Sequence, residues 1–162
     1  MRVIEAPIDF NDWTSLLQLL QSAFACMDGR IDPPSSLHRL DVAGLQSKAR
    51  QESLIIATRG DDLVGCAFAE VRHDCVYVGK VAVAAPYRGQ GIARRMLAVA
   101  EAIARRRGLQ ALELQTRVEL VENHRTFAAL GFTQAGETAH PGYNRPTSIT
   151  MRKQIPSRAA DA

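Results

Sequence analysis

A nearly continuous apolar run, CVYVGKVAVAA at residues 75–85, leads directly into a glycine-containing loop and then into a helical pattern. An apolar run without alternation is typical of a central strand covered on both faces, whereas a strand with one solvent-exposed face alternates apolar and polar residues. Strands meander before this run, and strands alternate with helices after it. We therefore predict a mixed α/β sheet covered by helices, with residues 75–85 at its centre.

Apolar periodicity and turn residues predict the other elements of the chain. In chain order these are a strand at 1–8, a helix at 9–25, a loop at 26–40, a short helix at 41–52, a hairpin at 53–72, a helix at 91–108, a strand at 109–117, a helix at 122–131 and a last strand at 148–153. Asp9 or Asn11 is suited to cap the first helix. We expect one domain over residues 1–153 and a flexible tail over 154–162.

The composition limits the class of protein. A chain of 162 residues is long enough for one domain with a sizeable core. Its content of 46% hydrophobic and 23% charged residues is typical of a soluble globular protein. The net charge of +3 is too small to indicate a nucleic-acid partner, and the basic residues are not interleaved with aromatic ones. We expect no nucleic-acid binding.

Neither a membrane segment nor a metal site is indicated. No stretch approaches the roughly 20 apolar residues of a membrane span. The N-terminal residues include Glu5 and Asp9 without a long apolar stretch, which argues against a signal peptide. Cys26, Cys66 and Cys75 form no C-x-x-C motif, so they suggest neither a disulfide framework nor a zinc site. We expect a cytoplasmic protein with buried, reduced thiols and no metal.

The loop that follows the apolar run has the features of an anion site. The sequence PYRGQGIARRML at residues 86–97 contains Gly89 and Gly91, three arginines and no carboxylate. The first N–H groups of a helix have no partner within the helix, and glycine allows another molecule to approach closely. A pyrophosphate suits such a site best. The P-loop motif is absent, and Arg94 stands where a dinucleotide-binding motif needs its third glycine. From spacing alone, a simple tight turn between strand and helix remains an alternative.

Two segments together resemble the GCN5-related N-acetyltransferase (GNAT) family. The family signature has glutamine or arginine, two residues, glycine, one residue, and then glycine or alanine; RGQGIA at 88–93 satisfies it after a V-x-V strand. ENHRTFAALGF at 122–132 resembles the family's segment that runs from asparagine through an aromatic residue to Gly-Phe. The resemblance covers about residues 1–153. It implies a single-domain, mostly antiparallel mixed sheet of six to seven strands flanked by about four helices.

The resemblance also implies an acetyltransferase that uses acetyl-CoA as its acetyl donor. The backbone N–H groups of residues 89–93 would hold the CoA pyrophosphate, and the backbone of Val81 and Val83 would pair with the pantetheine arm. Asn123 would bind the cofactor near the end of that arm. The implied cofactor-binding residues are Val81, Val83, Arg88, Gly89, Gln90, Gly91, Ile92, Ala93, Arg94, Asn123 and Phe127.

Two positions differ from the family pattern. A lysine-like amine has a pKa near 10.4, so its neutral form costs about 4.6 kcal/mol at pH 7 and a base is needed. Several family members carry a glutamate four residues before the V-x-V, where this chain has Tyr77; a water-ordering role would suit it. Glu70 and Glu119 are alternative bases. Phe127 occupies the usual position of a tyrosine acid and cannot donate a proton.

The acceptor is expected between two loops. His140 and Tyr143 lie in the connection before the last strand, near where acceptors enter in this family, and Asp28 and Asp32 belong to the opposite wall and could attract a cationic amine. The acceptor is a small-molecule or protein amine, and homodimers are common in the family. Because of Tyr77 and Phe127, a catalytically weak acyl-CoA binding or sensing protein is the alternative function.

Overall fold

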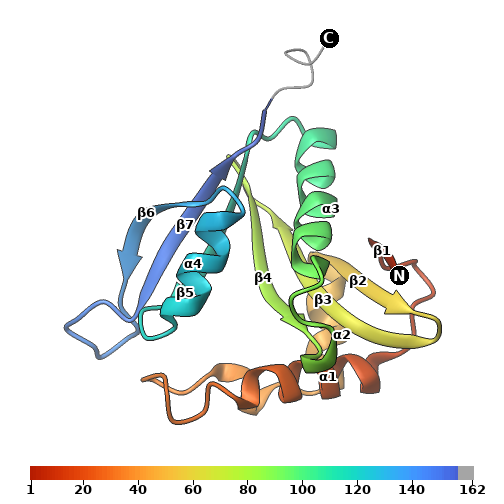
Figure 1. Cartoon of the computed structure of the whole chain (residues 1–162), viewed down its shortest axis with the longest axis horizontal. Helices are drawn as coiled ribbons and strands as arrows, with labels where there is room; N and C mark the ends of the chain where they lie inside the picture. Colours follow the sequence, from red (N-terminus) through yellow and green to blue (C-terminus); the bar gives the residue numbers. More distant parts are fainter. Residues whose placement is uncertain (157–162) are drawn as a thin grey trace.

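A computed structural model describes residues 1–156 and shows seven strands in the order β1-β2-β3-β4-β5-β7-β6 (Figure 1). The elements are β1 (Arg2–Glu5), α1 (Trp13–Ala25), η1 (Ser36–Arg39), α2 (Val42–Gln51), β2 (Ser53–Arg59), β3 (Asp62–Val71), β4 (Val76–Val83), η2 (Ala85–Tyr87), α3 (Ile92–Arg106), β5 (Ala111–Arg117), α4 (Val121–Ala129), β6 (Thr133–Thr138) and β7 (Ser148–Gln154). Neighbouring strands are antiparallel except for β4 and β5, which are parallel. The predicted fold class is confirmed.

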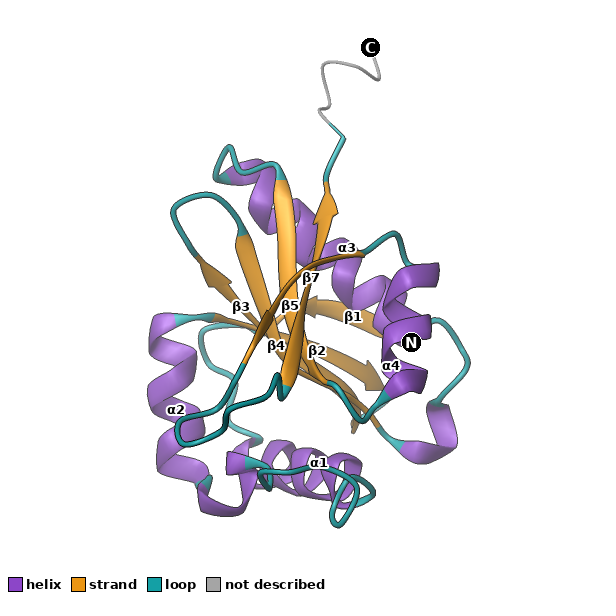
Figure 2. Ribbon diagram, turned by 90° about the vertical axis from the view of Figure 1, so that its left-hand side faces the viewer, coloured by secondary structure: helices purple, strands orange, loops and turns teal. Residues whose placement is uncertain are grey.

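Helices cover both faces of the central strand β4. On one face, Val76 and Val78 of β4 belong to a core that contains Met96 and Ile103 of α3. On the other face, Ala82 of β4 belongs to a second core that contains residues of α1 and α2. Figure 2 shows α1 and α2 together on one side of the sheet and α3 and α4 on the other. The continuous apolar pattern of β4 is thus explained by burial on both sides, as predicted.

Helices α1 and α2 differ in how their N-termini are capped. Asp41 precedes α2, and its Oδ1 accepts a hydrogen bond of 2.8 Å from the Gly44 N–H. The N-cap of α1 is Asp12, whose side chain makes no capping bond. The prediction of Asp9 or Asn11 as the cap is therefore wrong. The helix begins later because the Phe10 N–H bonds the Pro7 carbonyl in a turn and the Phe10 ring packs on Trp13.

This difference gives a stability prediction. We expect Asp41→Ala to lower the free energy of unfolding by about 1 kcal/mol, because the Gly44 N–H loses its acceptor. Asp12→Ala is the matched control and should cost clearly less, since no capping bond is lost. Chemical denaturation of both variants measures the two differences. Equal losses would show that the side-chain bond at Asp41 contributes nothing beyond its position.

The cysteines and the C-terminal end correct two expectations. Cys66 and Cys75 are buried, but Cys26 is exposed, so the prediction of buried thiols is wrong for Cys26. Burial raises the pKa of Cys66 to about 12 and that of Cys75 to about 11. Gln154 belongs to β7, and Ile155 is buried with its N–H bonded to the Gln110 carbonyl, so a tail cannot begin at 154. The final part of the predicted tail, residues 157–162, lies outside the described residues.

Two further observations apply to residues 1–156. No helix in this part of the chain is both long enough and apolar enough to pass through a membrane. The same residues form no group of three His, Cys, Asp or Glu side chains that could hold a metal ion.

Candidate active site

The central feature of the site is the divergence of β4 from β5. The two strands pair only at Val76–Leu112 and Tyr77–Glu113, although β4 continues to Val83 and β5 to Arg117. Figure 1 shows them close at one end and apart at the other. Beyond Tyr77, the side of β4 that faces β5 therefore has no strand partner among the described residues. An extended chain could pair with this edge as an added strand.

The loop between β4 and α3 exposes a run of free backbone donors. Gly89 and Gly91 have φ values of 77° and 81°, a left-handed conformation that glycine adopts at low cost. From Gly89 onward, the first backbone N–H with an acceptor is that of Arg95, which bonds the Gly91 carbonyl at 3.1 Å. Within residues 1–156, the N–H groups of residues 89–94 make no hydrogen bond. The positive end of the α3 dipole and these donors together are suited to bind an anion.

Arg88 and Gln90, two residues expected to bind the cofactor, have side chains that are hydrogen-bonded to nearby backbone carbonyls. The Arg88 Nε donates to the Val83 carbonyl at 3.1 Å, so this guanidinium is directed back to the end of β4. The Gln90 side chain donates to the Pro86 carbonyl at 3.4 Å. Arg94 is exposed in the first turn of α3. An ideal Cβ at Gly89 or Gly91 would meet no atom within 4 Å, so the space in front of the loop is open.

A cavity of about 260 Å³ lies beside the diverging part of β5. It is lined by Thr116 and Arg117 of β5, Asn123 of α4, Phe24 of α1 and His140 of the β6–β7 connection. Thr116 is buried, and its Oγ1 has no hydrogen-bond partner among the described residues. An unpartnered buried hydroxyl is costly unless a ligand or water uses it. Thr116 could not be identified from the sequence, because a lone threonine in a strand carries no motif.

Tyr77 lies at the point where the two strands begin to diverge. The Arg72 guanidinium is 4.0 Å from the centre of its ring, and Arg72 Nε lies 3.4 Å from a carboxylate oxygen of Glu70. Burial raises the pKa of Tyr77, while Arg72 and a backbone hydrogen bond with Gln115 lower it. The phenol therefore stays protonated at neutral pH, which excludes it as a base but leaves it able to donate a hydrogen bond.

The two alternative carboxylates differ in how they are bound. Glu70 is directly opposite Tyr77 in the β3–β4 register and is ion-paired with Arg72. Glu119 accepts the Asp32 N–H at 3.1 Å through Oε2, whereas its buried Oε1 has no partner among residues 1–156. The difference is that the unpartnered oxygen of Glu119 is buried, and Glu119 immediately precedes Leu120 at the cavity wall.

Phe127 lies one helical turn after Asn123, on the same side of α4. It is partly buried against the core that contains α3, and its ring packs edge-on against Phe132 at a centroid distance of 5.9 Å. Phe132 itself is only 2% exposed. Phe127 therefore contributes apolar packing at this place.

The two predicted acceptor loops are in contact, but their carboxylates are already paired. Asp32 accepts hydrogen bonds from the Tyr143 hydroxyl and, at 3.0 Å, from Arg145. Asp28 lies 3.0 Å from the His38 Nε2. Asp32 thus connects the two loops and does not offer a free carboxylate to a cationic amine, contrary to the expectation from the sequence.

His140 is the predicted acceptor-loop residue that reaches the cavity. Its Nδ1 is hydrogen-bonded to the Thr147 hydroxyl, and its backbone N–H donates to the same oxygen at 2.9 Å. Burial and the nearby Arg117 guanidinium lower the pKa of His140, so its imidazole is neutral at pH 7. A neutral imidazole at a cavity wall can accept a proton.

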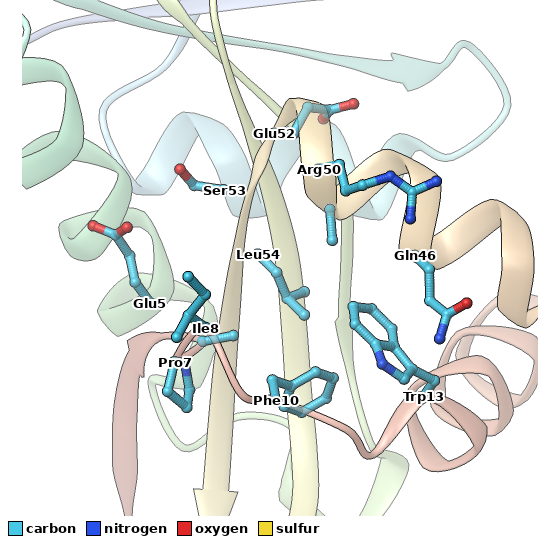
Figure 3. A pocket seen from close by; sticks show the side chains of 12 residues that line it. Glu5, Pro7, Ile8, Phe10, Trp13, Gln46, Arg50, Glu52, Ser53 and Leu54 are labelled. Atoms are coloured by element: carbon cyan, nitrogen blue, oxygen red, sulfur yellow. The ribbon is translucent and has the colours of Figure 1, made fainter.

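A larger cavity of about 640 Å³ lies elsewhere, between the β1–α1 connection and α2 (Figure 3). Phe10 and Trp13 line it together with Arg50. Its carboxylates are paired, Glu5 with Arg106 and Glu52 with Lys48. None of the site residues predicted from the sequence lines this cavity. We therefore take the divergence of β4 and β5 as the candidate active site.

A comparison with protein families assigns the chain. Residues 13–132 match the model of the acetyltransferase (GNAT) family. The chain belongs to this family. It is an N-acetyltransferase by class. The diverging strands β4 and β5 and the loop between β4 and α3 all lie within the matched region. A search of curated proteins found no match.

Solved structures share this GNAT fold at low sequence identity. The PaiA N-acetyltransferase of Thermoplasma acidophilum, solved with coenzyme A, has a TM-score of 0.79 at 13% identity over 96% of this chain and 100% of that one. The ribosomal-protein-S18-alanine N-acetyltransferase of Escherichia coli has a TM-score of 0.70 at 19% identity over 96% and 94%. An aminoglycoside 6'-N-acetyltransferase complexed with coenzyme A has a TM-score of 0.74 at 16% identity over 97% and 99%. At these identities the likeness concerns the fold.

Proposed function

We propose that this chain binds acetyl-CoA at the β4–α3 loop and transfers its acetyl group directly to the amine of a small molecule or protein. The observation that carries the proposal is the run of free N–H groups at residues 89–94, which is continuous with the unpaired edge of β4. Acetyl-CoA supplies the thioester, an activated acyl group, and the proposal requires no metal. Solved relatives that are named as complexes with coenzyme A support the same cosubstrate.

In this proposal, the protein contributes binding, orientation and proton transfer. The backbone of residues 89–93 binds the pyrophosphate, and Val81 and Val83 offer backbone groups to the amide-bearing arm. Asn123 and Phe127, on one side of α4, bind the end of that arm through a polar and an apolar contact. Tyr77 orders a water beside the acceptor amine, and either the free oxygen of Glu119 or the neutral imidazole of His140 takes the proton.

The absence of a tyrosine at position 127 gives a second prediction. A thiol has a pKa near 8.5, so a thiolate leaves readily at neutral pH without a dedicated acid. We expect Phe127→Tyr to change turnover by less than about tenfold, because an added hydroxyl has little to improve. Phe127→Ala should lose more, since it removes the packing against Phe132. Steady-state kinetics of both variants, with melting temperatures as a check on folding, measure this difference. An increase of about a hundredfold in Phe127→Tyr would instead indicate an enzyme impaired by a missing acid.

The proposed function is tested with the complete chain, acetyl-CoA and a panel of amines. Release of the free thiol of CoA is followed spectroscopically, and the mass of each acetylated amine is measured. Turnover that depends on a particular amine supports the proposal. Calorimetric binding of acetyl-CoA without turnover on any amine would contradict it and would support a binding or sensing protein.

A further inference from the structure

Lys80 is the residue at which β4 departs from regular strand geometry. Its φ is 50°, and the β3–β4 register shifts here, between the pairs Cys66–Ala82 and Phe68–Gly79. A β-bulge of this kind adds a residue to one strand and re-aims a side chain. A positive φ is uncommon for a residue other than glycine, and it has an energetic cost. The lysine at this point of the central strand therefore calls for a physical reason.

The bulge directs Lys80 to the face of the sheet that carries α1 and α2. Val81 and Val83, the next residues with the opposite orientation, pack against the core that contains α3. The ammonium of Lys80 instead interacts electrostatically with Lys48 and Glu52 at the end of α2. Lys80 thus lies on the face of the sheet opposite to α3, next to the end of α2.

The charge of Lys80 is not balanced by a bound carboxylate. Lys80 is half-buried, and within residues 1–156 its Nζ makes no hydrogen bond or ion pair. Glu52 is bound to Lys48 at 2.7 Å. Burial, followed by repulsion from Lys48, lowers the pKa of Lys80. A half-buried cation without a partner is costly, and an anion beside it would be stabilised.

Lys80 and Thr116, which lines the cavity beside β5, lie on the two diverging strands beyond their last pair. Tyr77 and Glu113 form the last pair, and Lys80 and Thr116 are each three residues further along their parallel strands. The cavity that Thr116 lines has no carboxylate among its described lining residues, whereas Arg117 contributes a cation. The lining itself therefore offers an acceptor a cation, and the nearby carboxylates of Glu119 and Asp32 already interact electrostatically with that Arg117 guanidinium.

We infer that the acceptor is an amine that also carries a carboxylate, such as a free α-amino acid, and that Lys80 binds this carboxylate. The inference rests on the proposed function, because it names the acceptor class of the same site. The ammonium of Lys80 forms a charge-assisted hydrogen bond with the carboxylate, and the amine is held toward the divergence of β4 and β5. Lys80 is thus a specificity-determining residue.

Matched acceptors that differ only in the carboxylate test this inference. The pairs are L-phenylalanine with 2-phenylethylamine, L-tryptophan with tryptamine, and L-lysine with cadaverine. We expect the wild-type chain to favour the amino acid in kcat/KM by about tenfold or more, the usual strength of a charge-assisted contact. In Lys80→Met the preference should fall by about tenfold, mainly through KM, and Lys80→Arg should retain it. Lys153→Met is the control, because Lys153 is paired with Glu101 of α3 at 2.7 Å.

Each result decides between defined alternatives. Turnover of the decarboxylated amines at an equal or higher kcat/KM would overturn the inference and leave the proposed function intact. A folded Lys80→Met with unchanged preference would overturn the role of Lys80. No turnover of any amine would overturn the proposed function itself and the inference with it. The comparison of acceptor pairs needs only the wild-type chain, so it remains decisive even where a variant fails to fold.

Discussion

Gly91→Glu is expected to weaken acetyl-CoA binding by about tenfold or more while the chain stays folded. The substitution places a carboxylate among the free N–H groups of residues 89–94, where an anion should bind. The new side chain has room, since an ideal Cβ at Gly91 meets nothing within 4 Å. Its negative charge is favourable for the α3 dipole but competes directly with the pyrophosphate. Calorimetric titration with acetyl-CoA measures the change.

Two control variants separate the charge from the backbone strain. Gly91→Ala introduces a side chain at the same φ of 81° without a charge, and should weaken binding less. Gly108→Glu introduces the same charge at φ 70° beyond the opposite end of α3, and should leave affinity unchanged. Thermal melting of all three variants shows whether each is folded. Wild-type affinity in a folded Gly91→Glu would remove this loop from the cofactor site.

The central strand, the loop and α3 could be predicted because their patterns are local. Val76 and Val78 face α3, on which Met96 and Ile103 recur at helical spacing and are buried. Val99, which also follows this spacing, is only partly buried. Local periodicity determines which side of an element is apolar, and this is sufficient to place elements that pack on one core.

Strand β6 lacked such a pattern. Its six residues, TQAGET, are almost all exposed and contain no alternation of apolar and polar side chains. The strand forms because it pairs with β7, and a register shift between Gln134 and Gly136 interrupts even this pairing. Backbone pairing at a sheet edge is a tertiary effect, so amino-acid composition alone could not define the strand.

The polar part of the site depends on contacts between distant segments. Asp32 and Tyr143 are separated by 111 positions in the sequence, yet their side chains are hydrogen-bonded. The sequence placed both residues near an acceptor site but could not show that they satisfy each other. Likewise, the position of Arg72 over Tyr77 follows from the register of β3 and β4, which pairs Glu70 with Tyr77. Residue types were readable from the sequence, whereas the pairing of charges was not.

Tyr77→Phe is expected to lower turnover by about ten- to a hundredfold, within the range of acid–base assistance. The hydroxyl is held at the start of the divergence, where the Gln115 backbone lies within hydrogen-bonding reach, and it can order a water beside the acceptor amine. Phenylalanine keeps the ring and its contact with Arg72, so folding and acetyl-CoA affinity should be preserved.

The pH dependence of this variant distinguishes a hydrogen-bonding hydroxyl from a base. Burial raises the pKa of Tyr77 above its usual value near 10, so the phenol is protonated over the range from about pH 6 to pH 9. If the hydroxyl only orders a water, its loss in Tyr77→Phe lowers the rate by the same factor at every pH in this range. The shape of the pH profile then remains that of the group that accepts the proton. Were Tyr77 itself the base, the wild-type rate would keep rising toward its raised pKa and the variant would lose that rise. Steady-state rates of both chains across the range separate the two roles, and identical profiles with identical rates would exclude Tyr77 from the mechanism.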